Sequence, residues 1–167
     1  MNKIVEEITR KFFNDNALVN ELDLLHLRPY IESFIDPNWL EDRLREYERW
    51  ASKYSDPVLQ RNLLHRPIGM NILIALIWAA RSWEKEYEAD SSYGPKGAVK
   101  RLINIALSMA ILELNASKYL DSIARRYIQQ RLQAADQFLG LAHEIYTYAH
   151  FAKKGAKLEP NFLGKAS

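Results

Sequence analysis

The stretch IGMNILIALIWAA, residues 68–80, contains only two residues that are not apolar, Gly69 and Asn71. A helix that spans a bilayer needs roughly 20 consecutive apolar residues, so this stretch is too short to cross a membrane. A helix that is apolar on all sides is instead typical of a position surrounded by other helices. The following residues, RSWEKEYEAD, are mostly charged. We therefore predict a central helix over 68–89 that passes from the core to the surface.

The length and composition of the chain limit the class of protein to which it can belong. A chain of 167 residues fits one domain with a substantial core. It has no cysteine, which excludes disulfides, thiolate nucleophiles and cysteine-ligated metals and favours a cytoplasmic location. Its first residues, MNKIVEEITRKFF, are amphipathic and lack the apolar run of a secretory signal. Glycine and proline number only 6 each, and the stretches between them have helical spacing, so we predict an all-α fold.

The helix boundaries follow from capping residues and from periodicity. Asp36 is placed to cap the start of a helix, and Pro37 is at the first helical position. Helical spacing continues without a proline from about 118 to 153, which predicts one long helix of about 50 Å that Gly140 either bends or packs closely. We predict a single helical bundle over 1–155 and a tail over 156–167.

The net charge of +2 hides a division between the two halves of the chain. Residues 1–94 carry 12 basic and 16 acidic side chains, whereas residues 95–167 carry 11 basic and 5 acidic ones. A basic carboxyl-terminal half is typical of a surface that meets a polyanion, although a merely solvated helix face has the same composition.

The candidate polyanion-binding residues lie in this basic half. The segment SSYGPKGAVKR could hold an anion before a helix, but it matches no Walker motif, and a plain loop is the simpler interpretation. Tyr146, Tyr148 and Phe151 lie near the last basic cluster, which suits phosphate contact with occasional base stacking, although aromatics at this spacing also fill cores. The predicted nucleic-acid-binding residues are Lys96, Lys100, Arg101, Lys118, Arg125, Arg126, Lys153 and Lys154.

Two charges interrupt apolar stripes. Arg131 falls within the apolar face of the predicted last helix, and Glu113 falls within that of the helix before it. An unpaired buried charge costs several kcal/mol, so each side chain should have a partner or lie at a subunit interface. If residues 115–117 form a tight turn, the two lie about 15 Å apart along the helices, which excludes a direct pair.

No complete set of catalytic or metal-binding residues is present. A di-iron bundle needs two Glu-x-x-His motifs, and the chain has only DLLH, residues 23–26. His143 and His150 flank Glu144 without a third ligand on the same helix and are expected to be surface histidines. We therefore predict no catalytic residue, no metal and no cofactor.

A helical ribonuclease of the HEPN class remains an alternative. Enzymes of that class pair an arginine with a histidine, and RNLLH, residues 61–65, brings Arg61 and His65 close in sequence. The intervening segment is one residue shorter than the pattern of that family requires.

The helical, cysteine-free chain with its ending IYTYAHFAKK resembles the small subunits of CRISPR effector complexes. Besides the general architecture, the resemblance depends on the short stretch Tyr148-Ala149-His150-Phe151. It implies a non-catalytic bundle that stacks along a ribonucleoprotein filament and contacts nucleic-acid backbone. The acidic first half departs from that pattern.

The resulting hypothesis is a non-enzymatic subunit of a larger assembly, with other protein subunits and RNA or DNA backbone as partners and no membrane. The alternative from another class is a protein-interaction or homo-oligomerisation module. In that case the basic face is only solvated, and Glu113 and Arg131 bridge subunits.

Overall fold

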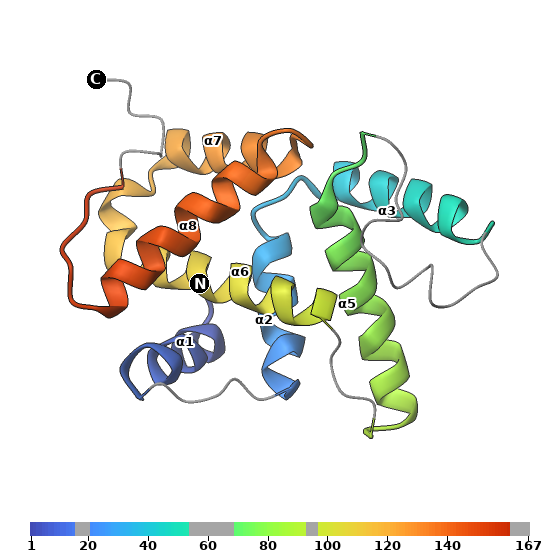
Figure 1. The fold of residues 1–167 in the computed structure, drawn as a ribbon, viewed down its shortest axis with the longest axis horizontal. Helices are drawn as coiled ribbons and strands as arrows, with labels where there is room; N and C mark the ends of the chain where they lie inside the picture. The colour runs from blue at the N-terminus through green and yellow to red at the C-terminus, as the bar shows by residue number, and fades with distance from the viewer. Residues whose placement is uncertain (16–20, 54–68, 93–96, 161–167) are drawn as a thin grey trace.

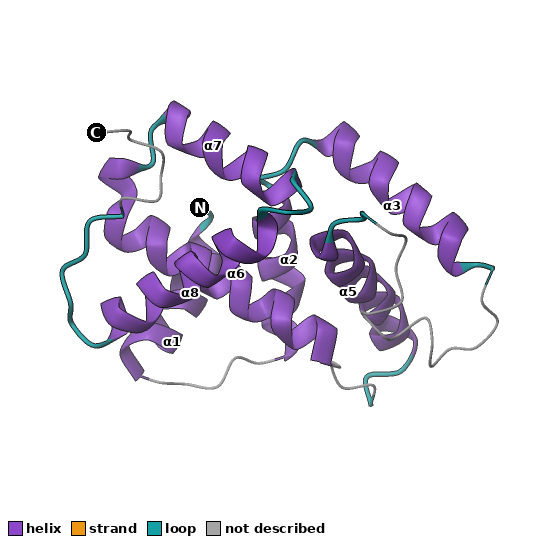
Figure 2. Cartoon of the chain, turned by 45° about the horizontal axis from the view of Figure 1, so that its top comes forward, coloured by secondary structure: helices purple, strands orange, loops and turns teal. Residues whose placement is uncertain are grey.

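In a computed structural model of the chain, the residues described are 1–15, 21–53, 69–92 and 97–160. They form α-helices and two short 3-10 helices, without a strand in these ranges, which confirms the all-α prediction (Figure 2). The elements are α1 (Lys3–Asp15), η1 (Glu21–Asp23), α2 (Leu24–Glu32), α3 (Pro37–Ala51), α5 (Ile72–Ala89), α6 (Gly97–Ala116), η2 (Ser117–Tyr119), α7 (Ser122–Gln133) and α8 (Phe138–Lys153).

The most enclosed helix is α6. It packs against α1, α2, α5 and α8, and every residue from 105 to 113 is buried (Figure 1). The predicted central helix is α5, which begins at Ile72 and packs against α2, α3 and α6. Its residues 73–77 are buried, so the assignment of the apolar stretch to the core is confirmed. The helix α6 is also apolar on nearly all sides, and four other helices cover it.

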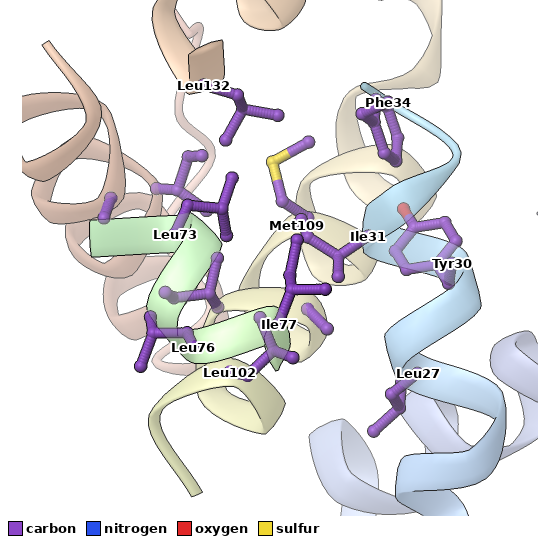
Figure 3. Close-up of a cluster of buried hydrophobic side chains, with 14 of the residues drawn as sticks. Leu27, Tyr30, Ile31, Phe34, Leu73, Leu76, Ile77, Leu102, Met109 and Leu132 are labelled. Atoms are coloured by element: carbon purple, nitrogen blue, oxygen red, sulfur yellow. The ribbon is translucent and has the colours of Figure 1, made fainter. Parts of the chain in front are cut away.

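The core forms where α2, α5 and α6 meet. Figure 3 shows Met109 of α6 between Leu73 of α5 and Ile31 of α2. All three side chains are fully buried. Burying a side chain of this size stabilises the fold by about 1.5–3 kcal/mol. Because other helices surround the buried halves of α5 and α6, no side of those halves meets water and requires polar side chains.

Asn71, one of the two polar interruptions of the apolar stretch, is the N-cap of α5. Its Oδ1 accepts a hydrogen bond from the backbone N–H of Leu73 (2.9 Å), and its Nδ2 donates to the carbonyl oxygen of Leu132 (2.6 Å). The side chain therefore joins the start of α5 to the end of α7. The predicted cap of α3 is confirmed, since Asp36 accepts from the N–H of Trp39 at 2.7 Å and Pro37 is the first helical residue.

The prediction of one long helix over 118–153 is wrong. The chain forms η2 and α7, leaves the helix at Ala134 with extended backbone, and begins α8 at Phe138. The bend therefore precedes Gly140. Both helices bury an apolar face, including Ile128 and Leu141 at 0% exposure. A continuous helix of about 50 Å would carry one of these faces past the core, so the turn allows both to be buried.

The predicted domain boundary lies close to the end of α8. Gly155 adopts a left-handed conformation (φ 81°), which ends the helix and which a side chain would strain. Residues 156–160 continue without helix, and Pro160 is buried again. The rest of the predicted tail, 161–167, lies outside the described residues. In the described ranges, no helix has both the length and the hydropathy to span a bilayer.

Candidate nucleic-acid interface

Glu113 forms a buried polar cluster within the chain. Its carboxylate accepts a hydrogen bond from the hydroxyl of Tyr30 (2.6 Å) and one from Nη2 of Arg125 (3.1 Å), and the amino group of Met1 lies 3.5 Å away. Burial alone would raise the pKa of Glu113, but these hydrogen bonds and positive charges outweigh it and lower the pKa. Glu113 therefore makes a buried polar contact within the chain.

Arg131 has a different partner. Its guanidinium donates two hydrogen bonds to the carboxylate of Glu144, at 2.7 and 3.0 Å, across the turn between α7 and α8. It also lies over the ring of Tyr127, at 5.5 Å from the centroid. The hydrogen bonds from Arg131 to Glu144 raise the pKa of the guanidinium, despite its partial burial. The two interrupting charges therefore do not pair with each other, as predicted, and each is compensated locally.

These contacts change the predicted set of cations. Arg125 is half exposed, but its charge is paired with Glu113, and its guanidinium lies 5.6 Å from the centroid of the Phe34 ring. It therefore contributes less free positive charge than the sequence suggested. Arg126, the next residue, is exposed on α7.

The remaining predicted cations fall into separate regions. Lys100 and Arg101 are exposed near the start of α6, where the hydroxyl of Tyr146 donates to the carbonyl oxygen of Arg101 at 3.5 Å. Lys118 follows the other end of α6, so that about 24 Å of helix separates it from Lys100. Lys96 lies outside the described residues, as do residues 93–95 of the predicted anion-binding loop. The structure thus does not gather the candidates into one face.

One group of lysines does gather at an end of the molecule. Figures 1 and 2 show the end of α8 and η2 at the same end, with residues 154–160 running between them. We define the basic edge as Lys118, Lys153, Lys154 and Lys157. Glu159 is the acidic residue of this connecting segment, and its charge acts on Lys118. The edge therefore carries an excess of positive charge.

Local contacts hold the basic edge in place. The N–H groups of Gly155 and Ala156 donate to the carbonyl oxygens of Ala152 (3.0 Å) and Phe151 (3.1 Å), which turns the chain back after α8. The ammonium of Lys153 lies 3.9 Å from the centroid of the Phe12 ring in α1. Such a cation–π contact contributes about 0.5–1 kcal/mol at an exposed site. Lys153 is therefore oriented by its contact with the Phe12 ring of α1.

Lys118 has a comparable aromatic neighbour. Its ammonium lies 4.7 Å from the centroid of the Tyr119 ring. A side-chain hydrogen bond with Tyr119 raises the pKa of Lys118 above its ordinary value. No ion pair involves any lysine of the basic edge within the described part of the chain. Among the described residues, the charges of the basic edge are therefore not neutralised by ion pairs.

Several acidic side chains of the first half form ion pairs in a network that the sequence did not predict. Arg28 bonds Glu84 (2.8 Å) and Glu32 (2.9 Å), and Arg81 bonds Glu32 (3.1 Å) and Glu41 (2.9 Å). The network joins α2, α3 and α5. Only the Arg28–Glu32 spacing of four residues was visible in the sequence. Its role is structural, and it leaves less free negative charge on the amino-terminal half.

The described residues contain no group of three or more histidine, aspartate or glutamate side chains that could hold a metal ion. His143 and His150 are exposed on α8, and Glu144 between them is paired with Arg131. Arg61 and His65, the candidate ribonuclease pair, lie outside the described residues.

We compared the chain with protein-family models, curated proteins and solved structures. No match was found in any of the three.

Proposed function

We propose that the protein is a non-catalytic helical subunit of a larger nucleoprotein assembly, and that its basic edge binds the nucleic-acid backbone. The observation that supports this is the basic edge itself, four lysines without an ion-pair partner among the described residues. Phosphate oxygens are suitable partners, because lysine binds them as a point charge without requiring a fixed geometry.

The expected strength of this contact favours a subunit over an independent binding protein. Each phosphate contact with a single strand contributes about 0.7 to the slope of log affinity against log salt. Three or four contacts therefore predict a loss of affinity of roughly 20- to 50-fold between 50 and 200 mM salt. Binding this weak and salt-sensitive becomes useful when neighbouring subunits hold the same strand.

The resemblance to small subunits of CRISPR effector complexes suggests one kind of assembly, located in the cytoplasm. Copurification of the native complex would identify the neighbouring subunits and test this part of the proposal. Nucleic acid and other protein subunits should copurify with the chain. Recovery of the chain alone, without either, would contradict membership of an assembly.

The backbone contact is tested by removing two charges from the basic edge. The double variant Lys153→Gln/Lys154→Gln is expected to weaken binding to a single-stranded oligonucleotide and to lower the salt slope by about 1.4. Fluorescence anisotropy at several salt concentrations measures both quantities.

A matched control removes the same charge elsewhere. Lys53 and Lys85 are exposed near the end of α3 and on α5, at the other end of the molecule (Figure 1). The variant Lys53→Gln/Lys85→Gln should bind as the wild type does. Equal losses in the two double variants would mean that only net charge matters, and the absence of binding by the wild type at low salt would refute the proposal.

Of the two alternatives, the interaction-module hypothesis is less well supported, and the ribonuclease hypothesis stays a prediction. The interaction-module hypothesis relied on Glu113 and Arg131 bridging subunits, and both have partners within the chain. The ribonuclease hypothesis depends on His65, and it predicts metal-independent RNA cleavage that His65→Ala abolishes.

A further inference from the structure

The ring of Phe151 is 46% exposed on the last turns of α8, beside the basic edge. Its neighbours on the same exposed side are His150, whose ring meets it edge-on at 5.4 Å and 82°, and Lys154, three residues later. Side chains three residues apart on a helix have Cβ atoms about 5–6 Å apart, so the ammonium of Lys154 can reach a group that covers the ring. An exposed aromatic face therefore lies within reach of a free cation.

The neighbours of Phe151 favour one kind of partner. A protein partner that covered the ring would also remove His150 and Lys154 from water, and uncompensated burial of an ammonium is costly. A nucleotide can cover the ring and also compensate the ammonium. Its base is flat and apolar on its faces, and its phosphate is an anion. In a duplex the faces of the bases are already stacked on one another, so a single strand is the form that can offer one.

The backbone at Phe151 is also held in a defined position. The carbonyl oxygen of Phe151 accepts a hydrogen bond from the N–H of Ala156 in the turn that ends α8. The edge-on contact with His150 limits the orientation of the ring. A preorganised ring loses less conformational entropy on binding than a mobile one.

We propose that Phe151 is a stacking platform for one base of single-stranded nucleic acid, while Lys154 contacts an adjacent phosphate. This inference rests on the proposed function and specifies the form of its ligand. It assigns affinity for the base to an aromatic ring and affinity for the backbone to the lysines, so the two contributions can be separated.

The experiment compares two strands of equal charge, an oligothymidine of about 16 nucleotides, near the upper site size of small single-strand-binding domains, and an abasic strand of the same length. The wild type is expected to bind the oligothymidine about fivefold or more tightly than the abasic strand, measured by anisotropy at low salt. Phe151→Ala should bind both strands as weakly as the wild type binds the abasic one. Phe151→Trp should retain the preference for bases.

Two controls separate stacking from other effects. Phe151→Leu keeps an apolar side chain without an aromatic face, so it should lose the preference as Phe151→Ala does. Since the ring is half exposed, the melting temperature of each variant should stay close to that of the wild type. A loss of binding to both strands by Phe151→Ala would indicate a structural role and overturn the inference.

The outcomes also distinguish this inference from the proposed function. If the wild type binds both strands equally, with the salt dependence and the Lys153/Lys154 effect described above, backbone binding stands and stacking is refuted. Tighter binding to a duplex than to a single strand of the same length would also refute stacking, but it would leave backbone binding in place. If the wild type binds neither strand at low salt, both proposals are refuted.

Discussion

Replacement of Ile74 by aspartate is expected to abolish the cooperative folding of this protein. Ile74 is 0% exposed within α5, so the substitution removes a buried apolar side chain and places a carboxylate in the core. The two effects together cost at least several kcal/mol, which is comparable with the total stability of about 5–15 kcal/mol of a typical domain. Urea denaturation followed by circular dichroism should show no cooperative transition for Ile74→Asp.

Ile123 provides the matched control for this prediction. It is 74% exposed at the start of α7, so Ile123→Asp exchanges the same side chains in water. We expect its free energy of unfolding to lie within about 0.5 kcal/mol of the wild-type value. A soluble, cooperatively folded Ile74→Asp protein would show that the core assignment of α5 is wrong.

The second large effect is expected at Glu113. Glu113→Ala leaves the buried hydroxyl of Tyr30 without its acceptor, while Arg125 is half exposed and can turn to water. An orphaned buried polar group costs about 1–3 kcal/mol, and the small cavity left by the side chain adds to it. We therefore expect a destabilisation of about 2–4 kcal/mol, measured by equilibrium denaturation at neutral pH.

A control variant removes the other partner. Tyr30→Phe deletes the hydroxyl and keeps the ring, so it should cost about 1–2 kcal/mol, less than Glu113→Ala. The double variant Tyr30→Phe/Glu113→Ala should be more stable than the sum of the single effects predicts, because the orphaned hydroxyl is gone. Additive effects would contradict a direct contact between the two side chains.

The same cluster makes stability depend on pH. Because the pKa of Glu113 is lowered in the folded protein, the unfolded chain takes up the proton first as the pH falls. The stabilisation by the carboxylate is therefore present above the ordinary glutamate pKa of about 4.3, and it is lost as the pH falls through the folded pKa. Glu113→Gln should reduce the acid-dependent part of the unfolding free energy, and an unchanged profile would argue against the ionised cluster.

Tyr30 gives the opposite dependence at high pH. Burial, and then the hydrogen bond to Glu113, raise the pKa of its hydroxyl above the ordinary value. Above about pH 10 the unfolded chain ionises while the folded protein does not, so the stabilisation is lost as the pH rises. Tyr30→Phe should remove this alkaline contribution from the unfolding free energy.

The helical class, the core position of residues 73–77 and the start of α3 at Pro37 could all be predicted from the sequence. Each depends on apolar spacing or on a cap a few residues away, which a single segment contains. Ile123 and Tyr127 are in helical phase with the apolar residues of α8, so periodicity could not reveal the break at Ala134. The residues of α7 that are buried are instead Ala124, Ile128 and Leu132, and Ile123 is exposed.

The candidate site was predicted less completely. The sequence identified Lys118, Lys153 and Lys154 as basic residues of the second half but grouped them with Lys100 and Arg101. The length of α6 separates these groups, and the turn after α8 brings Lys157 into the basic edge. The ring of Phe12 beneath Lys153 comes from the first helix, and no spacing in the sequence indicated that contact.

By itself the sequence determined that the chain is helical, which segments are buried, and that Glu113 and Arg131 need compensation, because segment-level hydrophobicity and the cost of a buried charge are local properties. The tertiary structure decided which helix is most enclosed, where the last helical segment turns, and which groups compensate the charges. Tyr30 is 83 residues from Glu113, and contacts over such distances depend on how the helices pack together.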